Sequence, residues 1–235
     1  LNELGVGRGD RVAIVLPNGP EMATAFVAIA NAATTAPLNP AYREDELDFY
    51  LGDLNARALV VLVGDDGPAV TVARRRGIAV LRLVVPTAAA AGEFELQGEA
   101  AGVAAHPGDA QPDDVALVLH TSGTTSRPKI VPLTHANICA SAAHIGATLA
   151  LTPADRCLNI MPLFHIHGLI AATLSSLAAG ASLYATPGFN ALRFFGWLDD
   201  ARPTWYTAVP TMHQAILARA ARNADSVAAA KLRFI

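Results

Sequence analysis

A hydroxyl-rich segment near the middle of the chain has the residue types that bind phosphate. Residues 120–129 read HTSGTTSRPK and lie between two apolar runs. The hydroxyl residues surround Gly123 and are Thr121, Ser122, Thr124, Thr125 and Ser126. Hydroxyls and backbone N–H groups, backed by the ammonium group of Lys129, are the donors that polyphosphate oxygens need. The segment is therefore predicted to be a loop that binds nucleotide phosphates.

This segment departs from the common P-loop motif. Pro128 stands where that motif requires its second glycine, and Ile130 replaces the Ser or Thr that would hold Mg²⁺. Judged from these residues alone, a polar surface hairpin without a ligand remains the alternative.

A pair of histidines forms the second stretch that could do chemistry, MPLFHIHGL at residues 161–169. His165 and His167 are two residues apart, directly after an expected strand. No third ligand is evident nearby, so a metal site is not predicted, and packing or capping is the alternative role for both rings. An imidazole can also donate a hydrogen bond to a carboxylate, which makes the pair a candidate for recognising an acid.

Alternating strand and helix patterns must position these stretches. Short β-branched runs predict strands at residues 10–16, 56–63, 78–85, 114–120, 129–133, 157–161 and 204–209. Apolar residues at helical spacing predict helices at residues 21–33, 43–54, 69–76, 135–150 and 191–201, and one that opens at Pro210. Residues 168–185 predict a buried helix, a break at Gly180 and a strand. The alternation predicts an α/β fold of mostly parallel sheets covered by helices.

The same pass along the chain suggests two α/β subdomains. Residues 1–112 would form the first, which ends in an irregular connection rich in Ala and Gly over about 86–112. Residues 113–235 would form the second. This second subdomain would carry both the phosphate loop and the histidine pair.

Composition and charge exclude several classes of function. Of the 235 residues, 52% are hydrophobic and 16% charged, which predicts a folded globular chain. The formal net charge of −3 and a basic run limited to Arg74–Arg76 give no support to nucleic-acid binding. No membrane span is predicted, because the apolar run at 168–185 is rich in Ala and Ser and is broken by Gly180.

The cysteines and the first residues bear on the compartment. Cys139 and Cys157 are far apart in sequence and are expected to be small, unpaired core residues in a reducing compartment. The first residues carry charges where a signal peptide needs an apolar core. Together with a composition rich in Ala and Arg, typical of high-GC bacteria, this favours the cytoplasm.

The hydroxyl-rich segment resembles the phosphate-binding signature of adenylate-forming enzymes, typically Ser/Thr-Ser-Gly-Thr-Thr-Gly-x-Pro-Lys-Gly. Ser126 and Ile130 occupy positions where that signature usually has glycine, and Ile130 is expected to continue the next strand. The stretches PLFHIHGLIAATLSSLAAGASL, TWYTAVPTMHQ and LRFI are similar to the branch that includes plant and yeast oxalyl-CoA synthetases. They cover most of the second half, and the first half agrees more loosely through GDRVAIVLPNGPE and PLNPAYREDELDFYL.

By this resemblance the chain is the N-terminal part of an acid–CoA ligase. Such an enzyme activates a carboxylic acid with MgATP to an acyl-adenylate and passes the acyl group to CoA, so ATP, Mg²⁺ and CoA are implied. A small dicarboxylate such as oxalate is the favoured acid, and a fatty acid is the other option. The stretch 121–126 and Lys129 would bind the nucleotide, with Lys129 and His165 catalytic, and His165, His167 and Val209 would line the acid pocket.

The resemblance leaves two other functions open. One is an acyl-AMP ligase or adenylation domain that loads a carrier protein, and the other is a non-catalytic remnant that binds a nucleotide. The acidic residue near Mg²⁺ and the small C-terminal domain of the family would lie beyond Ile235, so this chain alone is expected to be inactive. Assembly into a homo-oligomer is also left open.

Overall fold

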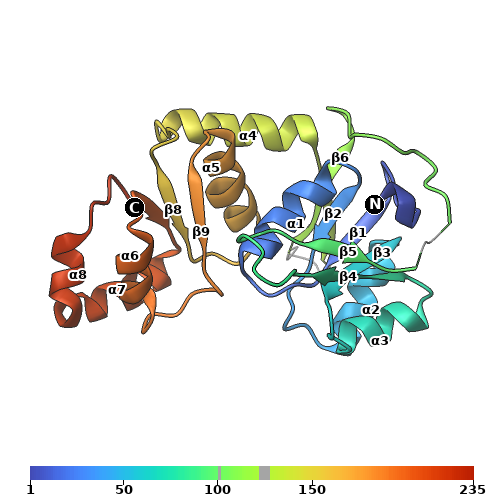
Figure 1. Ribbon diagram of the computed structural model, residues 1–235, viewed down its shortest axis with the longest axis horizontal. Coiled ribbons are helices and arrows are strands. Elements are labelled where there is room, and N and C mark those ends of the chain that lie inside the picture. Colours follow the sequence, from blue (N-terminus) through green and yellow to red (C-terminus); the bar gives the residue numbers. More distant parts are fainter. Residues whose placement is uncertain (100–101, 122–127) are drawn as a thin grey trace. The chain divides into compact units, whose positions relative to one another are not determined.

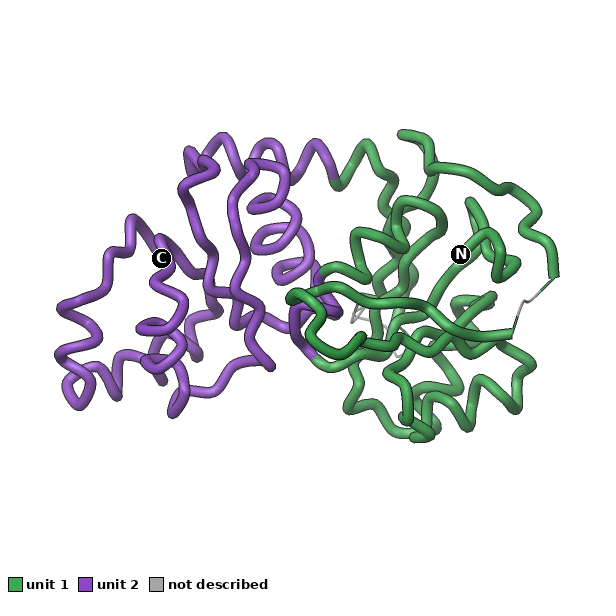
Figure 2. The backbone as a smooth tube through the Cα atoms, in the orientation of Figure 1, with its two compact units in different colours: residues 1–17, 24–138 green, residues 18–23, 139–235 purple. Residues whose placement is uncertain are grey.

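The computed structural model describes residues 1–99, 102–121 and 128–235. The chain divides into two units (Figure 2). The first comprises residues 1–17 and 24–138, and the second comprises residues 18–23 and 139–235.

The first unit is built on a seven-stranded sheet in the order β5-β4-β3-β1-β2-β6-β7 (Figure 1). Five neighbouring strands, from β4 to β6 in that order, are parallel, and the two edge strands β5 and β7 are antiparallel. The strands are β1 Arg11–Ile14, β2 Thr34–Pro37, β3 Ala58–Leu62, β4 Ala79–Val84, β5 Glu95–Gln97, β6 Val115–Thr121 and β7 Lys129–Thr134.

Two amphipathic helices of the first unit, α2 Glu44–Asp53 and α3 Pro68–Arg75, lie side by side (Figure 1). Buried leucines of α2 and valines of α3 pack in one core cluster with the side chains of β1 and β3. The first turn of α2 is fixed by the Glu46 carboxylate, which accepts from the Arg43 backbone N–H at 2.9 Å. Helix η1 spans Asn2–Leu4, and α1 Pro20–Ala30 and α4 His135–Thr148 each contribute residues to both units.

The second unit contains a three-stranded parallel sheet in the order β10-β8-β9. Its strands are β8 Arg156–Asn159, β9 Ser182–Ala185 and β10 Trp205–Thr207. Its core packs Leu158 and Tyr206 of the sheet against aromatic residues of α6. The helices are η2 His167–Leu174, α5 Ser175–Ala178, α6 Phe194–Ala201, α7 Pro210–Ala220, η3 Ala221–Asn223 and α8 Ala224–Ala229.

Helix η2 is a π-helix that begins at His167. Its second residue, Gly168, passes so close to the backbone of Pro162 that an added Cβ would lie 2.4 Å from the Pro162 carbonyl oxygen. The Thr173 hydroxyl donates to the Gly168 carbonyl at 2.8 Å, which adds a side-chain hydrogen bond across the first turn of η2. Only glycine fits this approach, so the start of η2 is fixed against the preceding segment.

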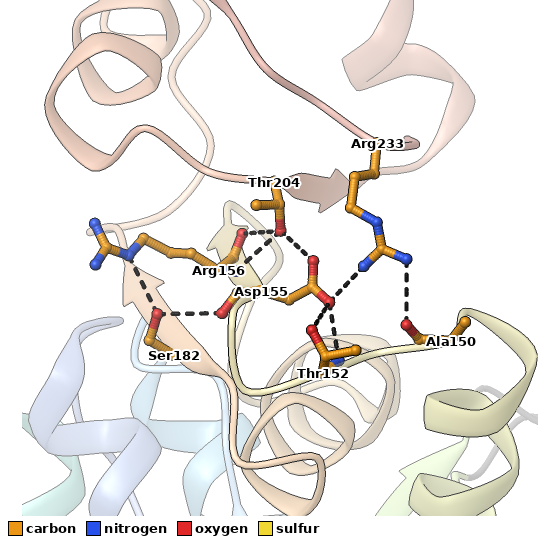
Figure 3. Close-up of polar contacts among 7 residues, drawn as sticks. All are labelled: Ala150, Thr152, Asp155, Arg156, Ser182, Thr204 and Arg233. Carbon is orange, nitrogen blue, oxygen red and sulfur yellow. Dashed lines mark hydrogen bonds and ion pairs between the residues drawn. The ribbon is translucent and has the colours of Figure 1, made fainter.

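The carboxylate of Asp155, just before β8, links three segments of the second unit (Figure 3). One oxygen accepts from the Thr152 backbone N–H at 2.9 Å and from its hydroxyl at 3.1 Å, and it also pairs with Arg233. The other oxygen accepts from the Thr204 hydroxyl at 2.7 Å. Arg233 in turn donates to the Ala150 carbonyl at 3.2 Å. The 1% exposed carboxylate therefore has partners on both oxygens.

These partners determine the charge state of Asp155. Burial by itself would raise the pKa of this carboxyl, but the hydrogen bonds from Arg233, Thr204 and Thr152 outweigh it and lower the pKa to about 2. The side chain is therefore ionised at every physiological pH.

The predicted α/β fold of mostly parallel, helix-covered sheets is confirmed. Every strand and helix predicted by range is present with shifted ends, but β2 and β5 were not anticipated. The units also divide after residue 138, whereas the sequence pattern places a boundary at 112/113. The reason is that β6 and β7 complete the first sheet through the β2–β6 pairing.

The expectation that both cysteines are core residues is wrong for Cys139. Cys157 of β8 is buried, and burial raises the pKa of its thiol, whereas Cys139 lies on an exposed face of α4. Neither is in a disulfide.

We predict that Asp155→Asn destabilises the second unit. A native pKa of about 2, below the unfolded value of about 3.9, stabilises the fold by roughly 2 kcal/mol above pH 4, and this is lost as the pH falls towards 2. In the protein at its natural length, hydrogen exchange of the β8 and β10 amides should show a loss of about 2–4 kcal/mol at pH 7. The control is Asp200→Asn on the exposed side of α6. Equal protection of the β8 and β10 amides in Asp155→Asn and Asp200→Asn would contradict the stabilising role assigned to Asp155.

Gly168→Ala should also destabilise this unit, because its Cβ meets backbone atoms that cannot rotate away. Overpacking of this kind costs about 1–3 kcal/mol. The matched control is Gly196→Ala in α6, where the added Cβ meets nothing within 4 Å and where alanine favours the helix. Thermal unfolding should show a lower midpoint for the first variant and an equal or higher one for the second. A higher unfolding midpoint for both variants would show that the close approach of Gly168 to the Pro162 backbone does not exclude a larger residue.

Candidate functional site

The two residues that flank the predicted phosphate loop are register partners in the first sheet. Thr121 ends β6 and Lys129 begins β7, and the two pair across this antiparallel hairpin. Both are exposed. The other predicted nucleotide-binding residues, Ser122, Gly123, Thr124, Thr125 and Ser126, lie outside the described residues. The structure therefore places Lys129 at the exposed first position of β7, across from the last residue of β6.

Ile130 continues the strand after the loop, as predicted. It pairs with His120 across the hairpin, is part-buried against the core of the first unit and does not have a positive φ. The departure from glycine at this position is therefore accommodated as ordinary extended backbone.

The end of β6 is anchored by a histidine that sequence reasoning did not single out. His120 Nε2 lies 3.0 Å from Asp53 Oδ2, and the histidine side chain is only 5% exposed. The rings of His120 and Tyr50 pack in a T-shaped arrangement with their centroids 4.7 Å apart. Tyr50 stacks on Tyr42 at 4.8 Å, and burial is the main reason that the pKa of Tyr42 is raised. These contacts fix the position of His120, which directly precedes Thr121.

The two histidines of the second unit have different environments. His165 is exposed, in the turn between β8 and η2, with its ring 5.0 Å from that of Phe164. His167 is part-buried at the start of η2, and its Nε2 lies 2.8 Å from the Thr207 hydroxyl. Burial lowers the pKa of His167 below its usual 6.5, so its imidazole is neutral at pH 7.

The segment that leads to the histidines is held at several points. The Asn18 side chain donates to the Met161 carbonyl and accepts from the Leu163 N–H, both at 2.9 Å. Asn159 Oδ1 accepts from the Met161 N–H at 3.0 Å. Side-chain amides thus supply hydrogen-bond partners for three backbone groups of the segment that follows β8.

Val209 lies at the junction between β10 and α7, where it is the N-cap residue in an extended conformation. Thr207, two residues earlier, is the partner of His167. The second unit therefore brings together His167 and the strand end that carries Val209. Tyr206, between α6 and the sheet, is a core residue, and its hydroxyl lies 3.4 Å from His213 Nδ1.

Within the described part of the chain, no three His, Cys, Asp or Glu side chains are grouped so that they could hold a metal ion. In the same residues, no helix has the length and apolar character needed to cross a bilayer. The described residues that flank the hydroxyl-rich segment offer a hydroxyl, at Thr121, and an ammonium group, at Lys129. Both groups can donate hydrogen bonds to phosphate oxygens.

Known proteins are similar to this chain over nearly all of its length. Oxalate–CoA ligase of Arabidopsis thaliana is 41% identical over 244 residues, which cover 100% of this chain and 46% of the ligase. Oxalate–CoA ligase of Saccharomyces cerevisiae is 36% identical over 235 residues, with coverages of 90% and 43%. Among solved structures, the long-chain-fatty-acid–CoA ligase FadD1 of Archaeoglobus fulgidus has a TM-score of 0.76 and 25% identity, covering 94% of this chain and 45% of FadD1.

The chain thus spans slightly less than half the length of the curated relatives that it matches. A family model described as AMP-binding enzyme matches residues 1–235, which is the whole chain. With the α/β sheets, the flanked hydroxyl-rich segment and the similarity to CoA ligases all in agreement, the chain belongs to the AMP-binding enzyme family.

Proposed function

We propose that the protein carrying this chain is an ATP-dependent acid–CoA ligase, with a small dicarboxylate such as oxalate as its acid. The observation that carries this proposal is the β6–β7 hairpin, which holds Thr121 and Lys129 as a donor pair at the two ends of a hydroxyl-rich segment. The similarity to two oxalate–CoA ligases supports the choice of reaction and of acid.

The proposed reaction has two steps. A carboxylate oxygen attacks the α-phosphorus of ATP, the bond to pyrophosphate breaks, and an acyl-adenylate forms. The thiol of CoA then attacks the acyl carbon, and AMP leaves with the bonding electron pair. Mg²⁺, when bound with ATP, neutralises part of the phosphate charge.

The role of this chain in the first step is to stabilise charge. Negative charge accumulates on the phosphate oxygens as the new bond forms, and fixed donors lower its free energy without having to reorganise. Lys129 supplies a full positive charge from the first residue of a strand, and Thr121 supplies a hydroxyl from the last residue of its register partner. The hydroxyl residues 122–126 are proposed to complete the set.

The acid is proposed to bind at the second unit, along His165, His167 and Val209. A neutral His167 is a hydrogen-bond donor that adds no net charge, which suits a short acid with a second polar group. A fatty acid remains the rival substrate, and FadD1 shows that a protein of this fold can be a long-chain-fatty-acid–CoA ligase. The proposed location is the cytoplasm, where two unpaired cysteines remain reduced.

We predict that Lys129→Ala slows adenylation by about 10²-fold, because one charged donor to the phosphates is lost. The measurement is acid-dependent pyrophosphate release by the protein at its natural length. Lys231→Ala is the matched control, since Lys231 is exposed and is the one other lysine of the chain. Unchanged release by the Lys129 variant would argue against the assignment of the hydroxyl-rich segment.

A panel of acids tests the substrate. Pyrophosphate release should be higher with oxalate than with malonate, short and long fatty acids, aromatic acids or amino acids. Formation of the acyl-thioester should require CoA. A preference for a fatty acid would keep the reaction and reject oxalate. Thioester formed only on a carrier protein would favour the carrier-loading function, and no release with any acid would favour a non-catalytic nucleotide-binding role.

A further inference from the structure

The backbone that carries His167 has little freedom. Gly168, its neighbour, is pressed against the Pro162 carbonyl, and the Thr173 hydroxyl closes the first turn of η2 onto Gly168. π-helical turns are rare and occur frequently at functional sites. Packing therefore fixes the position of the His167 Cα, and the orientation of the imidazole depends only on the side-chain torsion angles.

The imidazole is held by a residue of the sheet. Thr207 ends β10 and is the parallel register partner of Asn159 in β8, so its position is set by strand pairing. Its hydroxyl lies 2.8 Å from His167 Nε2. This contact crosses forty residues of sequence and fixes the ring orientation.

The direction of the hydrogen bond decides which ring nitrogen carries the proton. A threonine hydroxyl has a single hydrogen to donate. Among the described residues, His167 Nε2 is the partner that lies within hydrogen-bond distance of the Thr207 hydroxyl. If the hydroxyl donates, Nε2 is unprotonated and the neutral ring must carry its hydrogen on Nδ1.

We propose that Thr207 is a positioning residue that fixes His167 as the Nδ1–H tautomer, so that the ring offers a neutral N–H donor to an acceptor oxygen of the acid. This inference rests on the proposed function in assigning the acid as the partner. It deepens that function by naming the chemistry of selection: acids with a second carboxylate or similar acceptor group are preferred over acids with an alkyl chain.

The first test reads the tautomer without any turnover. Long-range ¹H–¹⁵N spectra of protein with ¹⁵N-labelled histidine report both ring nitrogens, and the signals lost in His167→Gln assign this residue. At pH 7 we expect a protonated Nδ1 and an unprotonated Nε2. In Thr207→Val, which keeps the shape and removes the hydroxyl, the Nε2–H form should appear, and Thr207→Ser should restore the original pattern. A wild-type Nε2–H ring, or a ring unchanged in Thr207→Val, would overturn the proposal.

The second test uses kinetics with oxalate and with a monocarboxylic acid. Thr207→Val removes one orienting hydrogen bond, so it should raise the KM for oxalate by about 2- to 13-fold with kcat within a few-fold. The KM for the monocarboxylic acid should change less, and Thr207→Ser should recover the oxalate value. Thr148→Val, on an exposed position of α4, is the matched control. Equal effects on both acids would overturn the selective role.

The two tests separate this inference from the proposed function. If no acid gives pyrophosphate release but the ring-nitrogen pattern is as expected, the ligase function is rejected and the tautomer assignment is supported. Normal ligase activity with ring signals and KM unaffected by Thr207→Val would support the ligase and reject the role of Thr207.

Discussion

Burying a carboxylate is unfavourable unless each oxygen is satisfied, and Asp155 meets this condition by drawing three separate segments together. The Thr204 hydroxyl that it binds lies one residue before β10, and the Thr204 N–H donates to the Arg156 carbonyl of β8 at 2.9 Å. The register of β10 on β8 is therefore set at this end. Three residues further on, the same register delivers Thr207 to His167. The contact between Thr207 and His167 thus depends on a charge at the opposite end of a very short strand.

Much of this fold could be predicted because periodicity reports burial directly. Strand β2 was not predicted because its four residues, TTAP, contain two threonines and a proline, whereas a buried parallel strand usually has β-branched apolar residues. The structure explains the exception: the Thr34 and Thr35 hydroxyls donate to the Val115 and Ala116 carbonyls at 2.6 and 2.8 Å. A polar strand can be buried when its side chains supply hydrogen bonds, and no single-sequence pattern reveals those partners.

The residue types of the candidate site can be read from local sequence, whereas the contacts of these residues cannot. Hydroxyls with a lysine, and two histidines after a strand, are local signals that need no tertiary information. The pairing of His167 with Thr207 and of His120 with Asp53 joins residues 40 and 67 positions apart. Such contacts depend on sheet order and register, which the order of elements along the chain does not determine. Local pattern therefore finds the groups that could react, and topology decides which of them are oriented.

The hydrogen bonds of the Asn18 side chain affect the entropy of ligand binding. Its amide uses both its donor and its acceptor on the backbone of Met161 and Leu163, so this segment is already ordered in the free protein. A ligand that meets a preorganised segment does not lose affinity to the ordering of a loop. The proposed substrate, oxalate, has few atoms with which to offset such a cost, so an ordered segment would favour its binding if this segment lines the site.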